Sequence, residues 1–109
     1  MAYINENVGL TTAEAEKFWP VYNEYNDKIR AIRKNLRQSY KKMPENLSEQ
    51  EAEQLHVLFI QSKQAEADVH RQYNEKIKAI IGAKKIVKLH VAEEEFRIKV
   101  MKSIKGEGD

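Results

Sequence analysis

The sequence predicts an all-α fold, and three observations lead to this prediction. Only 2 of the 109 residues are Pro and 4 are Gly, whereas charged residues make up 33% of the chain. This shortage of turn formers is typical of long helices. Apolar residues also recur at spacings of three and four, which is the pattern of one helical face. The third observation is a helix-start motif that occurs twice. We therefore expect one all-helical domain over residues 1–109.

The repeated motif consists of Leu, a hydroxyl residue, two further positions and then Glu-Ala-Glu. The hydroxyl oxygen can accept a hydrogen bond from a free backbone N–H in the first turn, and the first Glu can reach back to the N–H of the cap residue. This reciprocal pair of hydrogen bonds is a capping box, here called a helix-start box. Two helix-start boxes before two long amphipathic stretches suggest a duplicated helical unit. The defining residues are Leu10, Thr11 and Glu14 in the first copy, and Leu47, Ser48 and Glu51 in the second.

The first elements follow from apolar spacing and from helix breakers. Residues 2–9 should form a short helix or arm that stops at Gly9. A long helix is expected over 12–43, because the apolar positions from Phe18 onward keep to one face. Pro20 removes one backbone hydrogen bond and should bend this helix near its start.

Two further helices are expected after the break at 44–46. A second long helix covers 49–81 and stops at Gly82, and a third covers 84–104. The connection between the first two long helices is short, so we expect them to be antiparallel neighbours in a helical hairpin. The polar tail at 105–109 should be frayed.

The last helix carries two apolar stripes, rotated by roughly 100° from each other. One stripe can pack on the hairpin, but the second needs another cover. A second copy of the chain is the simplest cover, so we expect a homodimer. The first stripe contains Ile86, Leu89, Phe96 and Val100, and the second, the expected dimer interface, contains Val87, Val91, Ile98 and Met101.

Composition excludes some classes of functional site and argues against others. The net charge is only +2, which argues against nucleic acid as the default partner. There is no Cys, so thiolate chemistry is excluded. No stretch is apolar enough to predict a transmembrane helix. The first residues lack the features of a signal peptide, which fits either a cytosolic protein or a chain that begins after a removed signal.

Nothing in the sequence favours an enzyme. The three histidines, His56, His70 and His90, lack the local spacing of a helical metal pair, so we expect surface or boundary imidazoles and no metal or cofactor. A site shared between two chains remains an alternative for them. The carboxylates of the first turns are placed for capping and for the helix dipole, not for acid–base chemistry. Trp19 and Tyr25 should pack the capped end, with their polar tips finding partners.

Basic side chains crowd the second half of the first long helix. Most of these residues would suit an ordinary solvated helix surface. Three arginines, however, lie beside the apolar face with few acidic neighbours in the sequence, and an acidic or amphipathic partner would suit that edge. The expected client- or partner-binding residues are Arg30, Arg33, Arg37, Lys34 and Lys41.

The repeated motif resembles the LTxxQ motifs of the Spy/CpxP family of small helical envelope proteins. Here Glu14 and Glu51 replace the Gln, and Ser48 replaces the second Thr, which leaves the cap intact. Residues 10–25 and 92–97 are similar to a divergent branch described as sensors of extracytoplasmic-function sigma factors.

The resemblance implies a four-helix, cradle-shaped protomer that pairs as an antiparallel homodimer in the periplasm and has no catalytic activity. It also implies one of three roles, of which heavy-metal resistance gains little support because the chain has no Cys and no paired His. Some relatives bind unfolded proteins without nucleotide, on a basic and partly apolar concave face, and others report envelope stress to a signalling partner.

Two functions are therefore expected before any other. The first is a chaperone-like protein that binds unfolded or partner polypeptide on a basic-apolar surface. The alternative is a stress sensor that docks one defined partner of a sigma-factor or two-component pathway. An enzyme and a nucleic-acid binder rank third and fourth.

Overall fold

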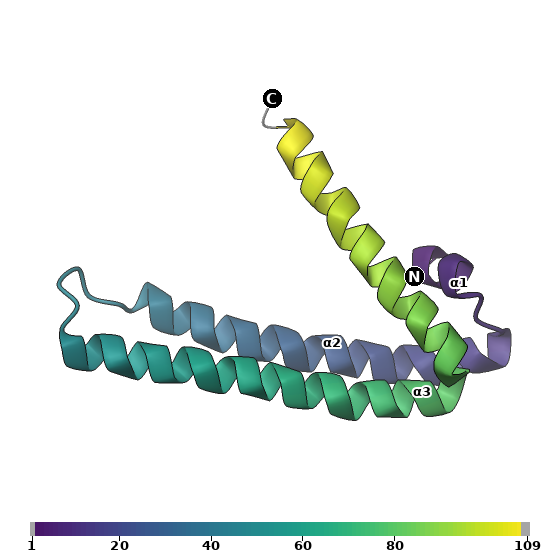
Figure 1. Ribbon diagram of the computed structural model, residues 1–109, viewed down its shortest axis with the longest axis horizontal. Helices are drawn as coiled ribbons and strands as arrows, with labels where there is room; N and C mark the ends of the chain where they lie inside the picture. Colours follow the sequence, from purple (N-terminus) through teal and green to yellow (C-terminus); the bar gives the residue numbers. More distant parts are fainter. Residues whose placement is uncertain (1, 108–109) are drawn as a thin grey trace. The chain divides into compact units, whose positions relative to one another are not determined.

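The described residues form an all-α structure without strands. A computed structural model describes residues 2–107, with side chains at 3–104. Three helices follow one another along this part of the chain: α1 at Ala2–Val8, α2 at Thr12–Lys41 and α3 at Glu49–Glu107 (Figure 1). The all-α prediction is confirmed for these residues.

Gly82 interrupts α3, as the sequence predicts. Its backbone angles are φ 84° and ψ 167°, so it separates a helix over 49–81 from a helix over 83–107. This positive φ is strained for a residue with a side chain, and glycine adopts it without steric cost. Gly9, which follows α1, has a φ of 74° for the same reason.

Two helix ends differ from the expected positions. α2 ends at Lys41, two residues earlier than expected, because the backbone N–H of Met43 bonds to the carbonyl of Tyr40 and tightens the last turn. Pro44 also disfavours a helical conformation at Met43. α3 continues to Glu107, whereas the expected end was residue 104. Of the expected frayed tail, residues 105–107 are helical and 108–109 lie outside the described residues.

The chain is built of two compact units, each with its own core. Unit 1 contains the described parts of Met1–Pro20 and Lys76–Asp109, and unit 2 contains Val21–Glu75. The buried apolar residues of unit 1 are Val8, Phe18, Ile77, Ile81, Ile86, Leu89 and Ala92, and those of unit 2 are Tyr22, Tyr25, Ile29, Leu36 and Tyr73.

Within unit 2, parts of α2 and α3 run antiparallel beside each other. The hydroxyl of Tyr25 bonds to Nδ1 of His70, and further along α2 the Nε of Arg33 donates to Oε1 of Glu66 at 2.8 Å. The partner number falls as the α2 number rises, which is the contact pattern of two antiparallel helices. The polar tip of Tyr25 thus finds a partner, as expected.

Within unit 1, α1 and the start of α2 contact the last part of α3. Tyr3 of α1 packs against Phe96 with ring centroids 5.6 Å apart. The indole N–H of Trp19 donates to Oδ1 of Asn5 at 3.1 Å, so this predicted polar contact is present as well. Glu14 pairs with Lys85 across 71 residues of sequence. Phe18 is fully buried in the same unit and packs edge-on against Trp19.

Both helix-start boxes have reciprocal hydrogen bonds. Glu14 accepts from the N–H of Thr11 at 3.0 Å, and the Thr11 hydroxyl accepts from the N–H of Glu14 at 3.1 Å. Ser48 and Glu51 form the same two bonds, each at 3.1 Å. The local pattern therefore fixes where α2 and the first part of α3 begin.

Loss of either cap should lower stability without affecting binding. Thr11→Ala and Ser48→Ala should each reduce the free energy of unfolding by about 1 kcal/mol, because a backbone N–H of the first turn loses its acceptor. Urea denaturation followed by circular dichroism measures this change. A variant that keeps its stability but loses binding to a client protein would instead make the motif a recognition element.

Candidate binding surfaces

The five basic residues expected to bind a partner all lie on the exposed surface of α2 in unit 2. At 100° per residue, Arg33 lies nearest α3, Arg37 is about 40° further round the helix, and Lys34 is about 100° from Arg33. Lys34, Arg37 and Lys41 form no ion pair with any other described residue. Exposed positive charge on α2 therefore extends from the side that contacts α3 to the outer face of the helix.

The expectation that the arginines have few acidic neighbours is wrong for two of them. Arg33 is paired with Glu66, which comes from the facing helix and lies 33 residues away in the sequence. Arg30 pairs with Asp27 at 3.5 Å, but both side chains are more than 70% exposed, so this pair is weak. Arg33 is thus held at the contact edge, while Arg37 is the arginine without a carboxylate partner among the described residues.

Glu66 is a buried carboxylate with two cationic partners. Only 9% of its side chain is exposed, and Lys63 approaches its second oxygen at 3.5 Å. Burial raises the pKa of Glu66, but the hydrogen bond and charge of Arg33, together with Lys63, outweigh burial and bring the pKa below its ordinary value. The carboxylate is therefore charged at neutral pH and links α2 to α3.

Two aromatic rings remain exposed on unit 2 although their spacing predicts burial. Tyr40 is 42% and Phe59 is 37% exposed. The ammonium of Lys63 lies 5.5 Å from the centre of the Phe59 ring, within the range of a cation–π contact. Apolar periodicity does not predict this exposed surface, because it assigns a residue to a helical face but not to the covered centre or the open edge of that face: Leu58, next to Phe59, is half-buried.

The last part of α3, in unit 1, exposes the second apolar stripe. Val87, Val91, Ile98 and Met101 are 59%, 51%, 41% and 58% exposed. Glu94 lies in the same stripe and bonds to Arg97 at 2.6 Å, which lowers the pKa of this carboxyl. Among the described residues this stripe stays largely open to solvent, although Arg97 donates to Sδ of Met101 at 3.3 Å.

The first stripe of the same helix is buried only at its start. Ile86 and Leu89 belong to the core, but Phe96 is 54% and Val100 is 41% exposed. On α1, Tyr3 contacts this helix at Phe96 and at Lys99, whose ammonium lies 5.1 Å from the centre of the Tyr3 ring. The apolar surface of the last helix is therefore larger than the sequence predicts.

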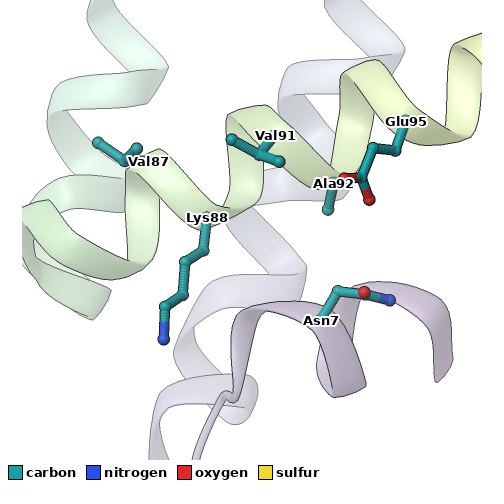
Figure 2. Close-up of a pocket in the computed structure, with 6 residues that line it drawn as sticks. All are labelled: Asn7, Val87, Lys88, Val91, Ala92 and Glu95. Atoms are coloured by element: carbon teal, nitrogen blue, oxygen red, sulfur yellow. The ribbon is translucent and has the colours of Figure 1, made fainter.

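A shallow hollow of about 220 Å³ adjoins the exposed stripe in unit 1. Figure 2 shows Asn7 on α1 facing the helix that carries the other residues, with Lys88 extending toward the α1 side. The hollow is large enough for one side chain but offers no cluster of charged groups. Its lining residues are Asn7, Val87, Lys88, Val91, Ala92 and Glu95.

A second hollow, of about 280 Å³, lies beside the connection at 42–48 in unit 2. Its lining is mainly apolar, with polar groups from both helices. The contributing residues are Ser39, Lys42, Met43, Pro44, Leu47, Glu51, Gln54, Leu55 and Leu58.

Comparisons with known proteins do not assign the chain to a family. No family model, no curated protein and no solved structure matches it. The similarity of its two motifs to Spy/CpxP proteins therefore remains a prediction.

The described part of the chain contains neither a metal-binding cluster nor a helix that could span a membrane. No group of three or more His, Asp or Glu side chains there is placed to hold a metal ion. Nor does any described helix combine the length and apolarity needed to cross a membrane. His56, His70 and His90 are all exposed, as expected for surface or boundary imidazoles, and His70 contacts Tyr25.

Proposed function

We propose that this protein is a non-enzymatic helical binding protein that captures unfolded or partner polypeptide on a basic-apolar surface. The observation that carries the proposal is the group of exposed basic side chains on α2. Three of them, Lys34, Arg37 and Lys41, have no described carboxylate partner. Exposed Tyr40 and Phe59 lie on the same unit. Charge can speed capture, and adaptable apolar contacts can tolerate different sequences.

The hollows on the described part of the chain are open and small. The two hollows are shallow and each could admit about one side chain. Drug-sized ligands and substrates usually occupy enclosed clefts that bury most of their surface. Hollows of this size suit a polypeptide that lies along an open helical surface better than they suit an enclosed small molecule.

The test is protection of an aggregating client protein, measured by light scattering at low and high salt. The variant Lys34→Glu/Arg37→Glu/Lys41→Glu should lose most of its protection and its salt dependence, since exposed charges act over about 8–10 Å at ordinary salt. The matched control, Lys17→Glu/Lys84→Glu/Lys102→Glu, makes the same change in net charge on exposed residues of unit 1.

Equal protection by a folded charge-reversed variant and by the wild type would remove the basic surface from the function. A wild type that protects no client would favour the alternative role, a stress sensor that docks one signalling partner. The resemblance to Spy/CpxP proteins supports a periplasmic location for either role.

We also propose that two copies pair through the exposed stripe of the last helix. In this proposal each protomer is a hairpin with a third long helix, and the dimer is cradle-like. Support comes from the four exposed apolar residues of the stripe, each of which would contribute roughly 1.5–3 kcal/mol if fully buried.

The dimer proposal predicts a change of mass on substitution. Val91→Glu/Ile98→Glu should convert the protein to monomers, because two carboxylates would enter an apolar interface. Ala79→Glu/Ala83→Glu, at exposed positions earlier in α3, should leave the mass unchanged. Light scattering measures the mass, and a monomeric wild type at high concentration would contradict the proposal.

A further inference from the structure

We propose that one edge of unit 2 selects acidic segments that carry an apolar side chain about three residues from the carboxylate. This edge, here called the aromatic-basic edge, consists of Arg33, Arg37, Tyr40, Phe59 and Lys63. The inference rests on the proposed function and names the chemistry of the polypeptide that the surface captures.

The ion pair between Arg33 and Glu66 fixes the alignment of this edge. Tyr40 follows Arg33 by seven residues, and Phe59 precedes Glu66 by seven residues. Seven residues are almost two full helical turns, so each aromatic residue lies on the same line of its helix as the paired residue. Because the two helices run antiparallel, Tyr40 and Phe59 lie at the same position along the helix pair, about two turns from the ion pair.

Along the helix pair, Arg37 and Lys63 lie between the ion pair and the two rings. Arg37 is one turn beyond Arg33, and Lys63 is one turn before Glu66. Lys63 contacts both Glu66, at 3.5 Å, and the Phe59 ring, at 5.5 Å. The edge therefore runs from an ion pair, through two cations, to a pair of exposed rings.

The charge of the edge favours a carboxylate as its ligand. Glu66 neutralises one of three cations, and the side chains of Arg33 and Lys63 remain 61% and 57% exposed. Arg33 bonds to Glu66 through Nε, and no described carboxylate contacts its terminal nitrogens. Arg37 has no described ion pair, and a guanidinium can bind a carboxylate through two parallel hydrogen bonds.

The rings supply the apolar part of the site. Tyr40 and Phe59 are each more than one-third exposed, and aromatic residues bind with little loss of side-chain freedom. The distance from the ion pair to the rings is about 10 Å at 1.5 Å per helical residue. An extended peptide covers this distance in about three residues, which sets the expected spacing between the acid and the apolar side chain.

The outer face of α2 provides an internal comparison. Lys34 lies about 100° from Arg33 around the helix, away from both rings. It supplies positive charge without an aromatic neighbour on its line. A surface that binds only by net charge would use Lys34 and Arg37 equally, whereas the aromatic-basic edge requires Arg37.

The experiment measures binding of short labelled peptides to the full chain by fluorescence anisotropy. One peptide carries Asp and Leu three residues apart; in the others, Lys replaces Asp, Ala replaces Leu, or the Asp–Leu spacing is eight. The first peptide should bind about tenfold more tightly than each of the others. A single-stranded oligonucleotide of equal length tests for a simple preference for anions.

The variants identify the residues that cause this preference. Arg37→Gln and the pair Tyr40→Ser/Phe59→Ser should each weaken binding of the first peptide by about tenfold, and Lys34→Gln, which removes one nearby charge but touches neither ring, should weaken it by about twofold or less. Neither Arg37 nor Tyr40 belongs to the buried core, so these variants should remain folded. Circular dichroism checks that they do.

Several outcomes would overturn the inference while leaving the proposed function intact. One is protection of clients by a wild type that binds all four peptides equally. Others are an equal loss of binding on Lys34→Gln and Arg37→Gln, or tighter binding of the oligonucleotide than of any peptide. If the wild type neither protects a client nor binds a peptide, the proposed function itself fails.

Discussion

Replacing Phe18 by Ala should lower the free energy of unfolding by about 3–5 kcal/mol. The Phe18 ring is fully buried in unit 1 and makes an edge-to-face contact with Trp19, with ring centroids 5.0 Å apart. Truncation removes the apolar area and leaves a cavity that the surrounding side chains fill only in part. Since whole domains are stable by about 5–15 kcal/mol, this single change should approach the limit of folding.

Phe96→Ala is the matched control, because the same truncation is made on a ring that is 54% exposed. It should lower stability by about 1 kcal/mol or less, through the lost contact with Tyr3. Urea denaturation at 25 °C gives both values. Equal losses for the two variants would mean that unit 1 is not organised around Phe18.

Arg33→Ala should destabilise the protein by about 2 kcal/mol at neutral pH, because it leaves the buried Glu66 carboxylate without its best donor. Arg30→Ala should cost less than about 0.5 kcal/mol, since its pair with Asp27 is exposed to water. Both substitutions remove an arginine from α2, so the difference in lost stability reports the effect of burying the paired carboxylate. Similar small losses for both would show that Glu66 finds sufficient compensation in Lys63 alone.

The effect of Arg33→Ala should also depend on pH. The pKa of Glu66 is lowered in the folded protein, so its contribution is present above the ordinary carboxyl pKa and is lost as the pH falls through the lowered value. Without Arg33, burial should raise that pKa, and the variant should lose less stability in acid than the wild type. The difference between the two proteins should therefore shrink from pH 7 to pH 3, as measured by urea denaturation. A constant difference would contradict the assignment.

The helix starts could be predicted because their causes are local. Thr11 with Glu14, and Ser48 with Glu51, lie three residues apart, and Gly82 is recognisable as a residue that permits a positive φ. The all-α class follows from the same local preferences. These features need no knowledge of which segments meet in the folded chain.

The candidate site was predicted less completely because its decisive contacts join distant segments. Arg33 was expected to have few acidic neighbours because Glu66 lies 33 residues away in the sequence. Exposure of Tyr40 and Phe59 depends on which side of each helix faces the other helix, since the neighbouring Ser39 and Leu58 are half-buried. The sequence indicated basic residues beside an apolar face, but the pairing between helices decides which cation is neutralised.

The two helix-start boxes should enter folding at different stages. The box of Ser48 and Glu51 is entirely local, whereas Glu14 also pairs with Lys85, which belongs to a segment 71 residues away. A contact across so long a loop forms only after the chain has closed that loop, and loop closure slows folding. The second box can therefore help to nucleate its helix in the unfolded chain, while the first gains its full strength late. Weakening Ser48 would then act mainly on the folding rate, and weakening the link from Glu14 to Lys85 mainly on the unfolding rate.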